Sequence, residues 1–227
     1  MRLEVCCDDM QSVKAAIAGG ADRVEVCYDL GVGGVTPEFS LVREAVATGI
    51  PVHALIRCRP GNFVYTGREL RLMQASIYIM KGMGVKGVVW GALTEDNEID
   101  WVACMKMAVK SDGLSVTFHR AFDEVRDPAK ALEELIELGC DRVLTSGHAQ
   151  DMVAGKDTLR DLVKQARGRI GILPGGGLKP DNARMIMEYT GVTEIHGSLR
   201  KIKYASREYV KRVRRTLDEI EKERALV

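Results

Sequence analysis

Short runs of apolar and β-branched residues alternate with longer amphipathic runs along the whole chain. This alternation is typical of repeated strand-helix units on a parallel sheet. The pattern predicts eight strands, at residues 3–7, 23–27, 52–57, 87–93, 115–120, 142–147, 170–174 and 194–198, and a final helix at residues 207–224. The chain is therefore expected to be an α/β protein with eight parallel strands.

The length of the chain favours closure of these strands into a barrel. Eight units within 227 residues leave little room for insertions, and a (β/α)8 barrel, or TIM barrel, takes roughly 250 residues. We expect one TIM-barrel domain over residues 1–227, with an open doubly wound sheet as the alternative. In both folds the functional side chains gather at the carboxyl ends of the strands.

The charge balance narrows the class of partner. The 33 lysines and arginines nearly equal the 32 aspartates and glutamates, and the net charge is +1. No long-range field favours nucleic acid or an anionic membrane, so small molecules are the expected partners. The chain enters a strand pattern at Leu3, with no apolar leader before it, and no run approaches the roughly 18 apolar residues of a membrane span. We expect a cytoplasmic protein.

Two of the predicted strands carry the same Glu-x-Cys pattern. Glu4 and Cys6 share one face of the first strand, and Glu25 and Cys27 share one face of the second. If these faces point into the barrel, the two carboxylates form a lower layer and the two thiols lie above them, within a few ångströms of each other. Two thiolates suit Cu(I), which prefers sulfur ligands. In the alternative interpretation, both cysteines are small buried apolar residues.

The other cysteines do not suggest a site. The six in the chain lack the paired spacing of a disulfide framework or a closed zinc site, so we expect free thiols in a reducing compartment. The carboxylates of Glu4 and Glu25 have their own alternatives. They are candidates for acid-base catalysis or for binding a hard divalent metal, or they form buried ion pairs with Arg57 or Arg120.

Histidines and arginines crowd the same predicted strand ends. His53 and His119 are candidate general bases or metal ligands, with His196 as a further candidate. Arg57, Arg59 and Arg120 suggest a carboxylate or phosphate ligand. Phosphate sites in barrels commonly use the loops after strands seven and eight, where the candidate anion-binding residues are Gly175, Gly176, Gly177 and Ser198.

Several catalytic motifs are absent from the sequence. No lysine ends a predicted strand, so a Schiff-base aldolase lacks an obvious nucleophile. No GxSxG or HExxH motif occurs.

The motifs at the strand ends resemble those of the CutC family of copper homeostasis proteins. They are Leu3-Glu4-Val5-Cys6, the segments 20–27, 33–37 and 51–53, Ile56-Arg57 with Arg59 and Gly61, and the segments 116–123 and 143–147. The resemblance implies a cytoplasmic TIM barrel that forms homodimers or homotetramers and has a role linked to copper. In that family copper binding is attributed to cysteines that match Cys6 and Cys27. It supplies no reaction. Asp123, Thr145 and Ser146 lie within these motifs at strand ends and complete the candidate substrate-binding residues.

Two functions therefore compete. The first is cytosolic Cu(I) binding by Cys6 and Cys27. The second is an enzyme acting on a small anionic or sugar-like substrate, with Glu4 or Glu25 and His119 as acid and base, and with Arg57 and Arg120 orienting the anion. A purely structural role leaves the polar strand ends unexplained.

Overall fold

Each predicted strand is present as a short, buried segment. The structure, a computed structural model, describes residues 1–226. The strands are β1 (Arg2–Cys7), β2 (Arg23–Val26), β3 (Val52–Leu55), β4 (Gly87–Trp90), β5 (Ser115–Phe118), β6 (Arg142–Thr145), β7 (Gly171–Pro174) and β8 (Glu194–Gly197). Most are buried on both faces, as expected for a parallel sheet covered by helices.

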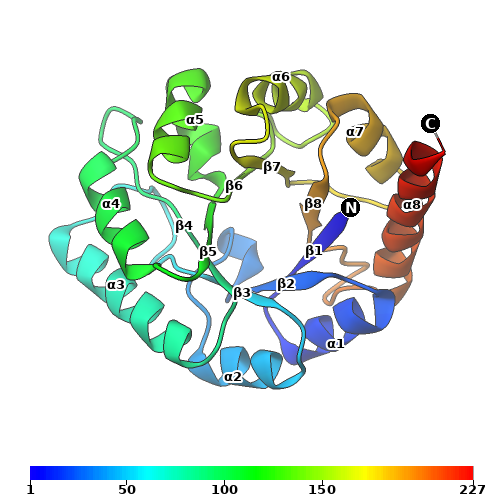
Figure 1. Ribbon diagram of the computed structural model, residues 1–227. Helices are drawn as coiled ribbons and strands as arrows, with labels where there is room; N and C mark the ends of the chain where they lie inside the picture. The colour runs from blue at the N-terminus through cyan, green and yellow to red at the C-terminus, as the bar shows by residue number, and fades with distance from the viewer. Residues whose placement is uncertain (227) are drawn as a thin grey trace.

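The strands form a nearly closed parallel barrel. They follow the order β7-β6-β5-β4-β3-β2-β1-β8, and the two ends of this order, β7 and β8, pack side by side. Figure 1 shows the strands at the centre and the helices as a ring around them. The predicted α/β fold with eight parallel strands is confirmed.

Within residues 1–226, eight α-helices and two short 3₁₀ helices connect or follow the strands. They are α1 (Met10–Gly19), η1 (Leu30–Val32), α2 (Phe39–Ala47), α3 (Gly67–Gly82), α4 (Trp101–Lys110), η2 (Arg120–Glu124), α5 (Pro128–Glu137), α6 (Lys156–Ala166), α7 (Ala183–Thr190) and α8 (Arg207–Ala225). Helix α8 packs against α1 and β1, where Arg214 contacts both Asp22 and the Met1 carbonyl oxygen. The last helix thus holds the first strand in place. No helix in the described part of the chain is long and apolar enough to cross a membrane.

Helix α3 illustrates how local sequence fixes an element. Thr66 and Glu69 form a reciprocal capping box at its start, which satisfies backbone N–H groups that have no partner within the helix. Met73, Ile77 and Met80 recur at helical spacing and are buried against the barrel. The burial of this stripe follows from its periodicity.

The strands end earlier than their hydrophobic runs predict. Cys27, Arg57, Arg120 and Ser198 were expected within strands, but each lies in the connection that follows. At the end of β5, His119 Nδ1 accepts a hydrogen bond from the Ala121 N–H and caps η2. The Ala121 N–H thus bonds to a side chain instead of to a neighbouring strand, and the sheet ends here. These residues therefore belong to the loops that surround the barrel mouth.

The register of β1 and β2 differs from the expected layering. Cys6 lies opposite Glu25, and Glu4 lies opposite Arg23. The two carboxylates thus do not share a layer, and Glu25 lies level with a thiol. The physical reason is that strand tilt and shear set the register between neighbouring barrel strands. A repeated Glu-x-Cys pattern carries no information about either quantity.

Candidate functional site

A pocket of about 320 Å³ opens at the carboxyl ends of the strands. This is the end at which TIM barrels bind their ligands. Its walls come from β1, β2, β3, β6 and β8 and from the loops after β2, β3, β5, β7 and β8. It is lined by Cys6, Glu25, Leu30, Gly33, Leu55, Arg57, Phe63, His119, Arg120, Leu144, Gly176, Gly177, Leu178, His196, Gly197 and Ser198.

Cys6 lines this pocket, and Cys27, which is fully buried, forms a thiol pair with it. Their Sγ atoms are 3.6 Å apart, and both side chains are buried. The hydrogen bond to Cys27, together with burial, raises the pKa of Cys6 well above its usual range. The same contact acts to lower the pKa of Cys27, but burial and the neighbouring Glu25 raise it overall. Both groups are therefore neutral thiols near pH 7 until a ligand displaces their protons.

Glu25 lies beside the thiols. Cys6 Sγ donates to Glu25 Oε1 over 3.1 Å, while Glu25 Oε2 is buried without a hydrogen-bond partner among the described residues. Burial raises the pKa of this carboxyl group. Glu25 is thus a carboxyl group with one oxygen free, positioned at the edge of the pocket.

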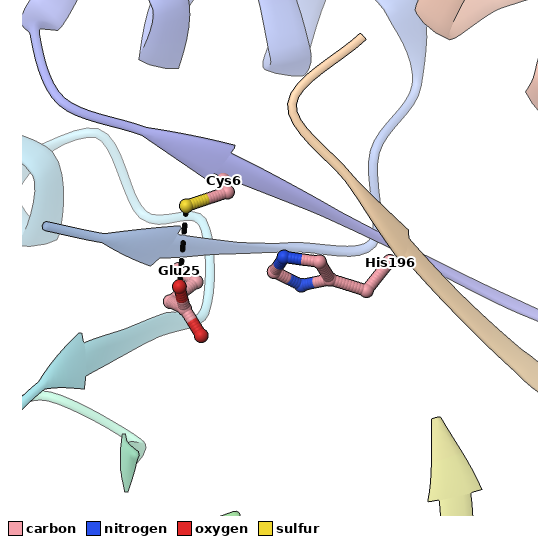
Figure 2. Close-up of side chains that lie close together, drawn as sticks. All are labelled: Cys6, Glu25 and His196. Atoms are coloured by element: carbon pink, nitrogen blue, oxygen red, sulfur yellow. Dashed lines mark hydrogen bonds between the residues drawn. The ribbon is translucent and has the colours of Figure 1, made fainter. Parts of the chain in front are cut away.

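His196 completes this group from the opposite side of β1. Its Nδ1 lies 2.6 Å from Glu4 Oε1, and because a carboxylate only accepts, Nδ1 carries the proton. Burial acts to lower the pKa of His196, but its interactions with Cys6, Glu4 and Glu25 raise it well above the usual range. Figure 2 shows the imidazole reaching from β8 toward Cys6 and Glu25. The ligating atoms of these three residues lie within 4.8 Å of one another.

A chain of buried ion pairs holds Glu4 beneath His196. Arg23 contacts both Glu4 and Glu194, and Arg142 lies 3.5 Å from Glu194. Burial acts to raise the pKa of Glu4, but the Arg23 charge and the hydrogen bond to His196 hold it well below its usual range. The alternative in which Arg57 or Arg120 pairs with the inward carboxylates is wrong for both Glu4 and Glu25 among the described residues, since Glu4 pairs with Arg23. Arg23 was missed, although it shares a strand face with Glu25 by the two-residue period.

The two candidate histidines occupy different positions. His119 lines the pocket, where burial and the Arg57 charge lower its pKa to about 3. Its Nδ1 accepts from Ala121, so Nε2 carries the proton, and it has no partner among the described residues. His53 instead lies outside the described pocket wall, with Nδ1 3.7 Å from Glu4 Oε2, and burial lowers its pKa to about 4.

The position of the His119 ring explains why residue 91 is a glycine. A Cβ atom at Gly91 would lie 2.7 Å from the His119 ring, so a side chain there would displace the imidazole. The ring also lies 4.8 Å from that of Phe63, centroid to centroid. His119 is therefore held on both sides.

Arg57 is a buried cation without a carboxylate partner among the described residues. Its guanidinium donates to the carbonyl oxygens of Val32, Gly34 and Gly61 and stacks over Phe63, 4.8 Å from the ring centroid. Arg59 lies outside the pocket wall, where it pairs with Glu69. The loop after β3 thus brings one of its two arginines to the pocket.

Arg120, Asp123, Thr145 and Ser146 form one hydrogen-bonded group. Asp123 accepts from Arg120 Nε over 2.7 Å, from Thr145, and from both the backbone and the hydroxyl of Ser146. Arg120 also donates to Ser146 Oγ over 2.9 Å. Of the four, Arg120 lines the pocket. The other three tie the loop after β5 to the end of β6 and so position Arg120.

The glycine run after β7 forms part of the pocket rim. Gly176 and Gly177 have φ angles of +91° and +81°, which favour glycine, and both line the pocket with Ser198. Gly175 packs below them, since a Cβ there would lie 2.4 Å from Leu144. Glycine is required at these positions by backbone geometry and close packing, whatever the ligand.

Comparison with known proteins identifies the relatives of this barrel. The model of the CutC family matches residues 1–201. A CutC family protein of Pasteurella multocida is 46% identical over 197 residues, which cover 86% of this chain and 81% of that protein. A human copper homeostasis protein cutC homolog is 46% identical over 201 residues, which cover 87% and 73% of the two chains.

Solved structures agree in fold. The CutC protein of Streptococcus agalactiae is 33% identical and superposes with a TM-score of 0.84, covering 87% of this chain and 98% of that one. A thiamine phosphate pyrophosphorylase of Pyrococcus furiosus, at 17% identity and a TM-score of 0.67, covers 96% of each chain and shares the fold alone.

Proposed function

Because the chain belongs to the CutC family, we propose that it is a copper homeostasis protein that binds Cu(I) through the thiolates of Cys6 and Cys27. The observation that carries this proposal is the 3.6 Å separation of the two Sγ atoms, one of which, that of Cys6, belongs to a residue that lines the pocket. Two thiolates on one tetrahedral ion with bonds of ~2.3 Å lie about 3.8 Å apart, so the pair needs little movement to bind one ion. Soft sulfur ligands favour Cu(I).

The surroundings of the thiols fit a monovalent ion. Two thiolates and one Cu(I) carry a net charge of −1, and the His196 imidazolium beside Cys6 offsets this charge. Binding releases two thiol protons, so affinity should increase with pH. Free thiols persist in the reducing cytoplasm, where we place the protein.

Anaerobic titration with Cu(I) against a competing chelator tests this proposal. Cys6→Ser and Cys27→Ser should each weaken binding at least about 100-fold, because loss of a direct ligand costs more than the 10- to 100-fold loss typical of outer partners. Cys140→Ser is the matched control, since it removes a buried thiol outside the pocket wall. Equal affinity in wild type and in the double variant would overturn the proposal.

A second function is favoured by Arg57. This side chain is 7% exposed, lines the pocket and contacts backbone carbonyl oxygens instead of a carboxylate. A buried charge without a counter-ion is costly, so an anionic ligand would stabilise the pocket. The residues around it suit an enzyme acting on a small anionic or sugar-like substrate, with Glu25 and His119 as the acid-base candidates within reach.

Calorimetric titration with inorganic phosphate and with short carboxylates checks this second function. Arg57→Gln should weaken anion binding about 10-fold or more, because a charge-assisted hydrogen bond contributes roughly 1.5–3 kcal/mol. Arg59→Gln, outside the pocket wall, is the control and should leave binding unchanged. An Arg57→Gln protein that binds both anions as wild type does would contradict an anionic substrate in this pocket.

A further inference from the structure

The pocket floor also holds a set of ligands that the two cysteines do not explain. Cys6, Glu25 and His196 come from β1, β2 and β8 and offer sulfur, oxygen and nitrogen within 4.8 Å of one another (Figure 2). Ligand atoms on a tetrahedral ion with bonds of ~2.0–2.3 Å lie about 3.3–3.8 Å apart. The Cys6 Sγ to Glu25 Oε1 distance of 3.1 Å lies just below this range, so a small adjustment would let both atoms bind one ion.

His196 has the orientation of a metal ligand. Its Nδ1–H is held by Glu4 over 2.6 Å, and Glu4 is itself held by Arg23. A carboxylate that fixes one ring nitrogen, and so directs the other, is the usual outer partner of a metal-binding histidine. The buried ion pairs beneath the pocket thus fix the ring that reaches toward Cys6 and Glu25.

Glu25 provides an independent sign of a missing ligand. The residue is 4% exposed, lines the pocket, and has one oxygen, Oε2, without a hydrogen-bond partner among the described residues. Buried polar atoms are nearly always satisfied, so such an oxygen calls for a bound group. A cation at the pocket floor would satisfy it.

The charges select a divalent ion for this ligand set. Metal binding displaces the Cys6 proton and the Nε2 proton of His196. The resulting thiolate, carboxylate and neutral imidazole carry −2, which a divalent ion neutralises, whereas Cu(I) would leave the buried cluster at −1. Mixed sulfur, nitrogen and oxygen ligands match the preference of Zn²⁺. Cys27, by contrast, is not part of the three-residue cluster.

We propose that Cys6, Glu25 and His196 form an open site for a divalent ion of the Zn²⁺ class, with a fourth coordination position facing the pocket. Three protein ligands and one open position are the arrangement of zinc sites that bind water or substrate. Arg57 and His119 lie on the pocket wall above this position. The site would hold an oxygen of a small anionic ligand between the metal and these two side chains.

This site goes beyond the Cu(I) proposal and does not depend on it. The two ions share Cys6, so they compete for the pocket floor. They differ in their other ligands, because Cu(I) needs Cys27 while the divalent ion needs Glu25 and His196. One set of variants can therefore separate the two proposals.

Titration with Zn²⁺ against a chromophoric chelator, and with Co²⁺ monitored by its visible spectrum, tests the site. Glu25→Gln and His196→Asn each remove a direct ligand, so each should weaken Zn²⁺ binding at least about 100-fold, more than the loss typical of outer partners, and abolish the thiolate-to-cobalt absorption. Cu(I) affinity should fall much less in both variants, because they keep Cys6 and Cys27 and His196 only offsets the charge of the copper site. Cys27→Ser should weaken Cu(I) binding strongly and leave Zn²⁺ binding and the thiolate-to-cobalt absorption close to those of wild type. His148→Asn, which removes a half-buried histidine outside the pocket wall, is the control and should leave both affinities unchanged.

Two results would overturn the divalent site. One is Zn²⁺ binding by Glu25→Gln and His196→Asn that matches wild type while both variants keep the wild-type circular dichroism spectrum. The other is a Cys27→Ser protein that loses Zn²⁺ as strongly as Cu(I), which would assign both ions to the cysteine pair. Loss of Cu(I) binding alone in Cys27→Ser supports the divalent site, and failure of Cu(I) to bind wild type leaves the Zn²⁺ comparison intact.

Discussion

Buried ionisable residues in this barrel divide into those with a charged partner and those without. Glu4 and His196 share a hydrogen bond and stay charged, supported by Arg23. His119 has no carboxylate against it and stays neutral beside Arg57. The Glu4–His196 pair is suited to holding the imidazole ring in a fixed orientation. His119 is suited to donating a hydrogen bond from Nε2 to a ligand.

The neutral state of His119 predicts a loss of stability in acid. Burial and Arg57 lower its pKa to about 3, whereas in the unfolded chain the pKa is near its ordinary value of about 6.5. Between these values the unfolded state binds the extra proton, so the free energy of unfolding falls as pH falls. The loss from this group is about 2 kcal/mol between pH 7 and pH 5.

Urea unfolding of wild type and of His119→Asn at both pH values measures this effect. Asparagine can still accept from the Ala121 N–H but cannot take up a proton, so the variant should lose less stability on acidification. His148→Asn is the control, because that side chain is only half-buried and should contribute less. Parallel loss in wild type and His119→Asn would show that His119 is not a source of the acid sensitivity.

At the scale of elements, periodicity predicted what each segment is but not how neighbouring segments align. The stripe of Met73, Ile77 and Met80 defined the buried face of α3. Strand ends were placed too late, because the hydrophobic run continues into loops in which side chains such as His119 satisfy the backbone.

The register of β1 and β2 decided which candidate residues meet. The register places Cys6 opposite Glu25, and Glu4 opposite Arg23, and so brings together the cluster that we propose as a metal site and the buried ion pairs beneath it. Register depends on the tilt of the whole barrel, so a single sequence does not reveal it. Strand parity did indicate that Glu4, Cys6, Glu25 and Cys27 could face inward, and it could have found Arg23 in the same way.

At the scale of the molecule, barrel closure assembles the site from the two ends of the chain. Cys6 and Glu25 come from the first two strands, and His196 from the eighth. The contacts of α8 with α1 and β1 support this meeting of the two ends. The anion-binding candidates on the loops after β3, β5 and β7 then surround the cluster of Cys6, Glu25 and His196.

The central claim is that Cys6 and Cys27 together bind Cu(I), and X-ray absorption at the copper edge tests it most directly. Protein loaded anaerobically with one Cu(I) should show two sulfur neighbours in wild type and one in Cys27→Ser. A wild-type spectrum with only nitrogen and oxygen neighbours, or one that Cys27→Ser leaves unchanged, would contradict the account.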